Sequence, residues 1–186
     1  MELLCRQCAQ PFTAEGARGR TPTYCSTRCR VAAYREREAS SFPVEMMGKR
    51  WTRADGKRPI MVDGAPASST NPNTWTAYDQ VATGDGLAGD GYGIMLGDGV
   101  GCYDFDNVFN VDGTLTGAAK VAVSAIREPI LYAERSISGR GMHVFVAASE
   151  CPGYRVPLSG GGSVERYTRE RFIRVTGDRV EVSQYV

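Results

Sequence analysis

Apolar and polar residues alternate along several short stretches in the second half of the chain, which is the pattern of half-buried strands. This pattern predicts strands at Tyr92–Leu96, Val100–Asp106, Ile130–Ser136, Met142–Ala147, Ser163–Thr168 and Phe172–Thr176. The turn residues Gly97–Gly99 separate the first two and predict a hairpin. The Gly-rich loop Ser159–Ser163 is expected to join two strands.

Two other segments favour helices. A short helix is expected near Thr74–Ala82, after the turn sequence Asn71–Asn73. A longer one is expected over Thr114–Ile126, whose apolar residues recur on one face, namely Leu115, Ala119, Ala122 and Ile126. Helices mixed with hairpin-connected strands predict an α+β fold.

The N-terminal residues contain two closely spaced cysteine pairs. Cys5 and Cys8 form a CxxC pair, and Cys25 and Cys29 form a CxxxC pair. Four thiolates at this spacing can bind one tetrahedral Zn²⁺, and a segment this short needs a metal to fold. Because the only histidine, His143, is remote in sequence, we expect an all-cysteine structural site.

A short helix is expected at Val31–Glu38, and the sequence Ala39–Pro43 interrupts it with small residues and a proline. We therefore expect a four-cysteine zinc-finger module over residues 1–38 and a larger domain over residues 44–186. The module is rich in arginine, which favours phosphate contacts with nucleic acid. A module that only docks on protein remains the alternative.

Charge is unevenly distributed along the chain. The net charge is +1, but residues 1–60 carry +6 and residues 61–186 carry −5. A hydrophobic content of 42% excludes a disordered chain, and no apolar run is long enough to cross a membrane. The N-terminus has no secretory signal, so we expect a cytoplasmic protein.

Two aspartates stand out in the strand predicted at Val100–Asp106. Strand alternation sends Asp104 and Asp106 to one face, and Tyr103 and Phe105 to the other, where Phe105 can enter the core. Adjacent carboxylates repel each other unless a divalent cation lies between them, and Mg²⁺ or Mn²⁺ is the natural occupant. A solvent-facing Asp-x-Asp on an edge strand is the alternative.

Two further segments contribute candidate residues. In Ser136–Val146, glycines flank Arg140 and precede His143, and both side chains could donate to a triphosphate. In Val164–Gly177, Glu165 stands among arginines and is a candidate third metal ligand. The alternatives are a packed histidine and a surface ion pair.

Five motifs in this order resemble the primase-polymerase domain of phage and plasmid replication proteins, within the archaeo-eukaryotic primase superfamily. They are GKRP (Gly56–Pro59), ASSTNPNTW (Ala67–Trp75), GYGIMLGDGVGCYDFDN (Gly91–Asn107), SISGRGMH (Ser136–His143) and VERYTRERFIRVTG (Val164–Gly177). The resemblance implies an RRM-like catalytic core with a mixed or antiparallel sheet. It also implies template-directed nucleotidyl transfer on single-stranded DNA, with nucleoside triphosphates and two divalent ions.

The same resemblance assigns roles to individual residues. It makes Asp104, Asp106 and Glu165 the Mg²⁺ or Mn²⁺ ligands, and His143 the catalytic contact to the triphosphate. Ser138, Arg140 and Lys57 join His143 in nucleotide binding. No P-loop follows the core, so unwinding is expected from a separate helicase.

We therefore expect a small phage-encoded DNA primase or primase-polymerase. Two alternatives stay open from the residues alone. The same metal site could cleave nucleic acid as a nuclease, or the chain could be a zinc-finger nucleic-acid-binding replication adaptor without turnover.

Overall fold

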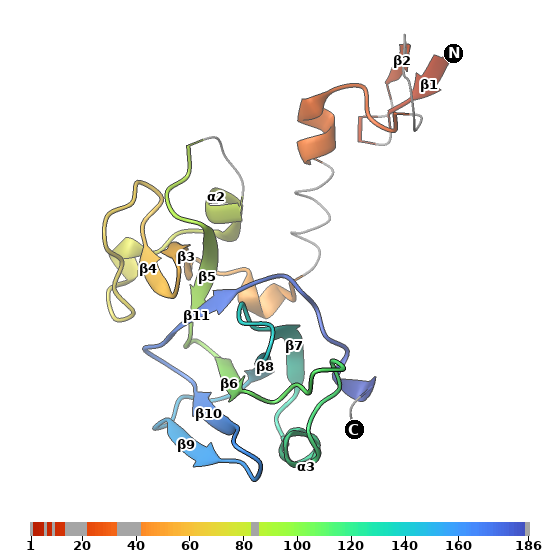
Figure 1. Ribbon diagram of the computed structural model, residues 1–186. Helices are drawn as coiled ribbons and strands as arrows, with labels where there is room; N and C mark the ends of the chain where they lie inside the picture. Colours follow the sequence, from red (N-terminus) through yellow and green to blue (C-terminus); the bar gives the residue numbers. More distant parts are fainter. Residues whose placement is uncertain are drawn as a thin grey trace. The chain divides into compact units, whose positions relative to one another are not determined.

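The computed structural model describes residues 2–5, 7–8, 10–13, 22–32, 42–82 and 86–184 (Figure 1). The chain divides into two compact units, Met1–Ser41 and Phe42–Val186. In the first unit, β1 (Glu2–Leu4) and β2 (Pro11–Thr13) form an antiparallel hairpin, and residues 27–32 are helical. Most of the helix predicted at Val31–Glu38 lies outside the described residues.

The second unit is built on two sheets in which every pairing is antiparallel. The five-stranded sheet has the order β7 (Ile130–Arg135), β8 (Met142–Ala147), β6 (Val100–Asp106), β10 (Ser163–Tyr167) and β9 (Tyr154–Pro157). The four-stranded sheet has the order β11 (Phe172–Val175), β5 (Gly91–Met95), β3 (Trp51–Asp55) and β4 (Arg58–Ile60). The expected α+β class with mostly antiparallel sheet is confirmed.

Few helices accompany these strands. Among the described residues of the second unit, the α-helices are α2 (Tyr78–Ala82) and α3 (Gly117–Ser124), and the 3-10 turns are η1 (Val44–Met46), η2 (Pro72–Thr74) and η3 (Val182–Gln184). The longer predicted helix therefore begins later than expected, because the hydroxyl of Thr116 caps it by accepting from the Ala119 N–H. The predicted helix near Thr74–Ala82 is split into η2 and α2.

Two connections carry the chain from one sheet to the other. β5 lies in the four-stranded sheet and continues through the tight turn at residues 97–99 into β6, which lies in the five-stranded sheet. The predicted turn therefore forms, but the two strands do not pair as the expected hairpin, because only an isolated bridge between Gly97 and Val100 joins them. The second crossing, from β10 to β11, runs in the opposite direction. Because β6 pairs with β10 and β5 pairs with β11, the two crossings lie next to each other.

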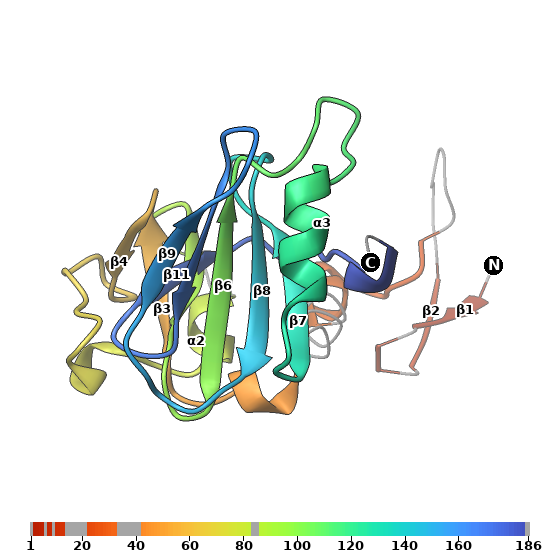
Figure 2. The ribbon, with the colours of Figure 1, turned by 90° about the horizontal axis from the view of Figure 1, so that it is seen from below.

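One face of the five-stranded sheet is covered by α3, which lies across β7 and β8 in Figure 2. Phe105 is fully buried in this core and packs with Val144 and Ala119, as the alternation in β6 predicts. The residues predicted to share one helix face also pack there, with Leu115 and Ala119 buried and Ala122 and Ile126 partly buried. The part of this face that packs against α3 is apolar. Asp104 and His143 lie on the opposite face.

An aromatic cluster covers part of that opposite face. Tyr132 of β7 contacts Phe42 with ring centroids 4.9 Å apart, and Phe42 contacts Trp51 and Tyr78 at 5.2 Å each. Phe145 of β8 lies beside Tyr132. Beyond these rings the same face carries charged side chains.

Candidate functional site

A row of ionisable side chains crosses the five-stranded sheet on the face opposite α3. Glu134 of β7 pairs in register with His143 of β8, and His143 pairs with Asp104 of β6. Asp104 in turn pairs with Glu165 of β10, and Glu165 with Arg155 of β9. Direct cross-strand neighbours share a face. All five strands therefore place one ionisable residue in the same row.

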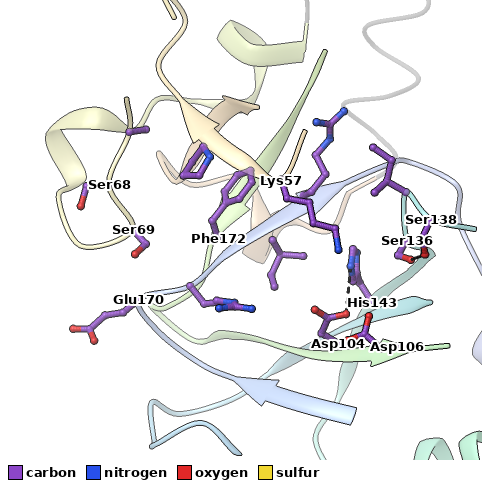
Figure 3. Close-up of a pocket in the computed structure, with 16 residues that line it drawn as sticks. Lys57, Ser68, Ser69, Asp104, Asp106, Ser136, Ser138, His143, Glu170 and Phe172 are labelled. Carbon is purple, nitrogen blue, oxygen red and sulfur yellow. Dashed lines mark hydrogen bonds and ion pairs between the residues drawn. The ribbon is translucent and has the colours of Figure 1, made fainter. Parts of the chain in front are cut away.

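A pocket of about 640 Å³ lies over the middle of this row (Figure 3). Asp104, Asp106 and His143 line it from the five-stranded sheet. Figure 3 shows the Lys57 side chain extending toward His143 and Asp104, while Glu170 points away from them. The pocket thus brings the predicted aspartate pair, the predicted histidine and the predicted lysine together.

The electrostatics of Asp104 reflect its crowded position. Its side chain is only 21% exposed. Burial raises the pKa of Asp104, and the nearby carboxylates of Asp106 and Glu165 raise it further, while His143 and Lys57 act in the opposite direction. The site therefore favours positive charge next to Asp104.

His143 lies between two carboxylates. Its Nε2 atom is 3.6 Å from the Oδ1 atom of Asp104, and its Nδ1 atom is 2.9 Å from the Oε1 atom of Glu134. Glu134 is fully buried at the end of β7 and also accepts hydrogen bonds from the backbone N–H groups of Thr176 and Gly177. The imidazole orientation is therefore fixed from the side away from the pocket.

Glu165, the predicted third metal ligand, is engaged by basic and phenolic groups. Its Oε1 atom is 3.1 Å from Arg155 Nε, and its Oε2 atom is 3.7 Å from an Arg171 nitrogen. The Tyr167 hydroxyl donates to the same Oε2 atom at 2.7 Å. Glu165 neighbours Asp104 across the strand pair, but it does not line the pocket.

The predicted Ser-Gly-Arg-Gly segment is the tight turn between β7 and β8. Gly139 has a φ of +71°, which a residue without a side chain adopts most readily. Ser138 lines the pocket, and its hydroxyl lies 3.1 Å from that of Ser136. Arg140 is exposed and does not line the pocket; its carbonyl accepts the N–H groups of residues 108 and 109.

Lys57 occupies the turn between β3 and β4, and the partly buried Arg174 holds that turn in place. Arg174 donates to the Gly56 carbonyl at 2.7 Å and to Asp90 Oδ1 at 2.8 Å. The Gly56 N–H donates to the same Asp90 oxygen at 3.0 Å. The hydrogen bond from Arg174 also lowers the pKa of Asp90. This network anchors the backbone that carries Lys57.

The four N-terminal cysteines form a compact cluster that could hold a zinc ion. The Sγ atoms of Cys5, Cys8, Cys25 and Cys29 all lie within 4.8 Å of one another. The Cys8–Cys25 and Cys25–Cys29 sulfur distances are 3.7 and 3.5 Å. A tetrahedral site with Zn–S bonds of about 2.3 Å has sulfur–sulfur distances of about 3.8 Å. The cluster thus has the dimensions of a zinc site.

Local structure and thiol acidity fit the same interpretation. The Cys5 N–H donates to the Gln10 carbonyl, and the Ser26 hydroxyl accepts from the Cys29 N–H at the start of the helical segment. Desolvation of the Cys5 thiol raises its pKa, but hydrogen bonds from backbone N–H groups outweigh this effect and lower the pKa of Cys5 to about 6. The hydrogen bond with Cys29 raises the pKa of Cys25 to about 12. Crowded thiols resist successive ionisation, and a divalent cation removes that resistance.

Within the part of the chain that the structure describes, these cysteines are the one group of three or more Cys, His, Asp or Glu residues close enough to share a metal. The carboxylate oxygens of Asp104, Asp106 and Glu165 are not all close enough to one another to share one ion. The assignment of Glu165 as a metal ligand stays a prediction.

Sequence reasoning missed Glu134 and the pocket-lining role of Arg171. Glu134 follows four apolar or aromatic residues in β7, and alternation along that strand gives it the same face as Tyr132. A lone acid in an otherwise apolar strand was therefore the available signal. Arg171 precedes β11 and lines the pocket with its side chain 47% exposed.

No family model matches the chain, and no curated protein matches its sequence. The likeness to the primase-polymerase family and its RRM-like core therefore stays a prediction. None of the helices in the described residues is long and apolar enough to cross a membrane.

Proposed function

We propose that the chain is a nucleotidyltransferase, a small DNA primase or primase-polymerase that extends nucleic acid on a single-stranded DNA template. The observation that supports the proposal most is the paired carboxylates of Asp104 and Asp106 in a pocket that cationic side chains also line. This combination suits a nucleoside triphosphate, which brings both a polyanion and its bound divalent ion. A role in DNA replication and a phage origin belong to this same proposal.

The carboxylate pair fits Mg²⁺ or Mn²⁺. Both ions prefer carboxylate oxygens, and Mg²⁺ is commonly held by one or two carboxylates together with substrate phosphates. Burial raises the pKa of Asp104, and the carboxylates of Asp106 and Glu165 raise it further, so a bound cation would stabilise the ionised form of Asp104. Asp104 and Asp106 would hold the ions, and Glu165 could join them only by leaving Arg155 and Arg171. When bound, such ions activate a 3′-hydroxyl and neutralise the leaving pyrophosphate.

The protein's own side chains would bind and orient the triphosphate. Lys57 and Arg171 supply positive charge at the pocket wall, where phosphate oxygens need it. His143 presents Nε2 and Ser138 presents a hydroxyl from the same side of the pocket. Arg140 would act mainly through its carbonyl, which fixes the chain leaving β6.

In the proposal, the N-terminal unit is a structural zinc module that binds the template. Arg28 and Arg30 are both exposed on its helical segment, where they can contact phosphates. A separate helicase would open duplex DNA. Filter binding of single-stranded DNA at increasing salt tests this part. Replacing Arg28 and Arg30 with alanine should reduce the slope of log K against log salt by about 1.4, which is the loss expected for two phosphate contacts on a single strand.

The deciding experiment is primer synthesis on single-stranded DNA with nucleoside triphosphates and Mg²⁺ or Mn²⁺. We expect products from the unmodified protein and none from the double variant Asp104→Ala with Asp106→Ala. Asp112→Asn is the matched control, because Asp112 is exposed and does not line the pocket. Synthesis that survives the double substitution would refute the site.

Two other outcomes would point to the alternatives. Metal-dependent shortening of labelled DNA that the double variant abolishes would indicate a nuclease. DNA binding without incorporation under either metal would indicate a replication adaptor.

A further inference from the structure

Glu134, which contacts His143, is held in place by backbone groups in the protein interior. The carboxylate of Glu134 is completely buried, and both of its oxygens accept hydrogen bonds from the backbone. Oε2 accepts from Thr176 N–H at 3.0 Å and from Gly177 N–H at 2.9 Å. Oε1 accepts from Thr176 N–H at 3.1 Å and lies 2.9 Å from His143 Nδ1.

We propose that Glu134 is a positioning residue that keeps a proton on Nδ1 of His143 and aims Nε2 into the pocket. An ionised carboxylate can only accept hydrogen bonds, so the short contact to Nδ1 requires the proton to be on that ring nitrogen. The partner of one ring nitrogen sets the state of the other. His143 therefore meets a ligand through Nε2 alone, which accepts a hydrogen bond when the ring is neutral and donates to a phosphate oxygen when both ring nitrogens are protonated.

The backbone donors explain why the arrangement is rigid. They come from residues 176 and 177, directly after β11, and the same segment stays attached to the edge of β7. There the Arg135 N–H donates to the Asp178 carbonyl at 2.8 Å, and the Val180 N–H donates to the Ala133 carbonyl at 2.9 Å. Glu134 thus has fixed partners on the side away from His143.

The geometry predicts a specific response to Glu134→Gln. The amide oxygen of glutamine is the atom that can accept both backbone N–H groups, so it takes the place of Oε2. The amide nitrogen then takes the place of Oε1 and faces Nδ1 as a donor. Nδ1 of the neutral ring must accept, and its proton moves to Nε2. A one-atom substitution therefore reverses the two ring nitrogens.

Nitrogen-15 NMR of the full chain tests this directly, because His143 is the only histidine and gives a single set of ring signals. In the unmodified protein, at a pH where the ring is neutral, we expect the proton on Nδ1 and none on Nε2. In Glu134→Gln, at a pH where the ring is neutral, we expect the protonated signal on Nε2. Glu181→Gln is the matched control, since Glu181 is exposed and pairs with Arg179, and it should leave the ring signals unchanged.

An unprotonated Nδ1 in the unmodified protein would overturn the proposal, and this result needs no variant to fold. An unchanged Nδ1 proton in a folded Glu134→Gln protein would overturn it as well. The identity of the ligand that contacts Nε2 rests on the proposed function, and a separate titration with ATP tests it. Adding ATP with Mg²⁺ should shift Nε2 more than Nδ1; no shift would count against the nucleotide while leaving the role of Glu134 intact.

Discussion

Replacing Phe105 with alanine should destabilise the second unit by about 3–5 kcal/mol. The ring is completely buried between β6 and α3, and it packs with Leu115, Val144 and Met142. A phenylalanine buries about 150–250 Å², and about 25 cal/mol is lost for each Å² of apolar surface no longer buried. The neighbouring strand and helix are held in place by other contacts, so a cavity adds to the cost.

Urea unfolding followed by tryptophan fluorescence measures this loss in one unit alone. Both tryptophans, Trp51 and Trp75, lie in the second unit. With a denaturant slope of about 1–3 kcal/mol/M, the midpoint should fall by about 2 M. Val121→Ala is the control, because Val121 is 70% exposed on α3 and should change stability by about 0.5 kcal/mol or less. A midpoint for Phe105→Ala close to that of the control would refute the assignment of Phe105 to the core.

Three further predictions concern acid stability, metal and close packing. Burial alone would raise the pKa of Glu128, but hydrogen bonds from Arg166 outweigh burial and hold this pKa below its usual range. The pair of Glu128 and Arg166 therefore stabilises the fold fully above the unfolded pKa of about 4.3, and this stabilisation is lost as pH falls through the lower folded pKa. The gap in urea midpoint between the unmodified protein and Glu128→Gln should therefore narrow toward pH 3, and a constant gap would contradict this. Elemental analysis should find about one zinc per chain, lost in Cys8→Ser and kept in Cys151→Ser, and zinc retained by Cys8→Ser would contradict the four-cysteine site. Gly93→Ala should destabilise by about 1–3 kcal/mol or more, because its Cβ would lie 2.3 Å from the Ile173 carbonyl, whereas Gly117→Ala, with nothing within 4 Å, should be neutral or stabilising by up to about 1 kcal/mol.

Local patterns predicted the parts of the fold that depend on near neighbours in sequence. Alternation placed β6 and its two faces, since Phe105 is buried and Asp104 reaches the pocket. β9 escaped prediction because all four of its residues are exposed at a sheet edge and show no alternation in burial. β3 and β4 were missed although Asp55-Gly56 is a hairpin signal, with Gly56 at a φ of +59°.

In the candidate site, too, the sequence predicted the features that depend on spacing along the chain and missed those that depend on strand pairing. Asp104 and Asp106 are two residues apart, so their shared face follows from the strand period. The contact between Glu134 and His143 depends on how β7 pairs with β8, and the ion pair of Glu165 with Arg155 on how β10 pairs with β9. Register across strands is a property of the folded sheet, and spacing along the chain does not reveal it.

The charged row also limits how the sheet can assemble. A slip of β6 by one residue against its neighbours would turn Asp104 toward α3 and bring Phe105 out over the pocket. An aspartate without a partner among Val144 and Ala119 would cost several kcal/mol. The same carboxylates that line the pocket therefore disfavour a misregistered sheet. Neutralising them for an activity assay also removes a safeguard against strand slippage and aggregation.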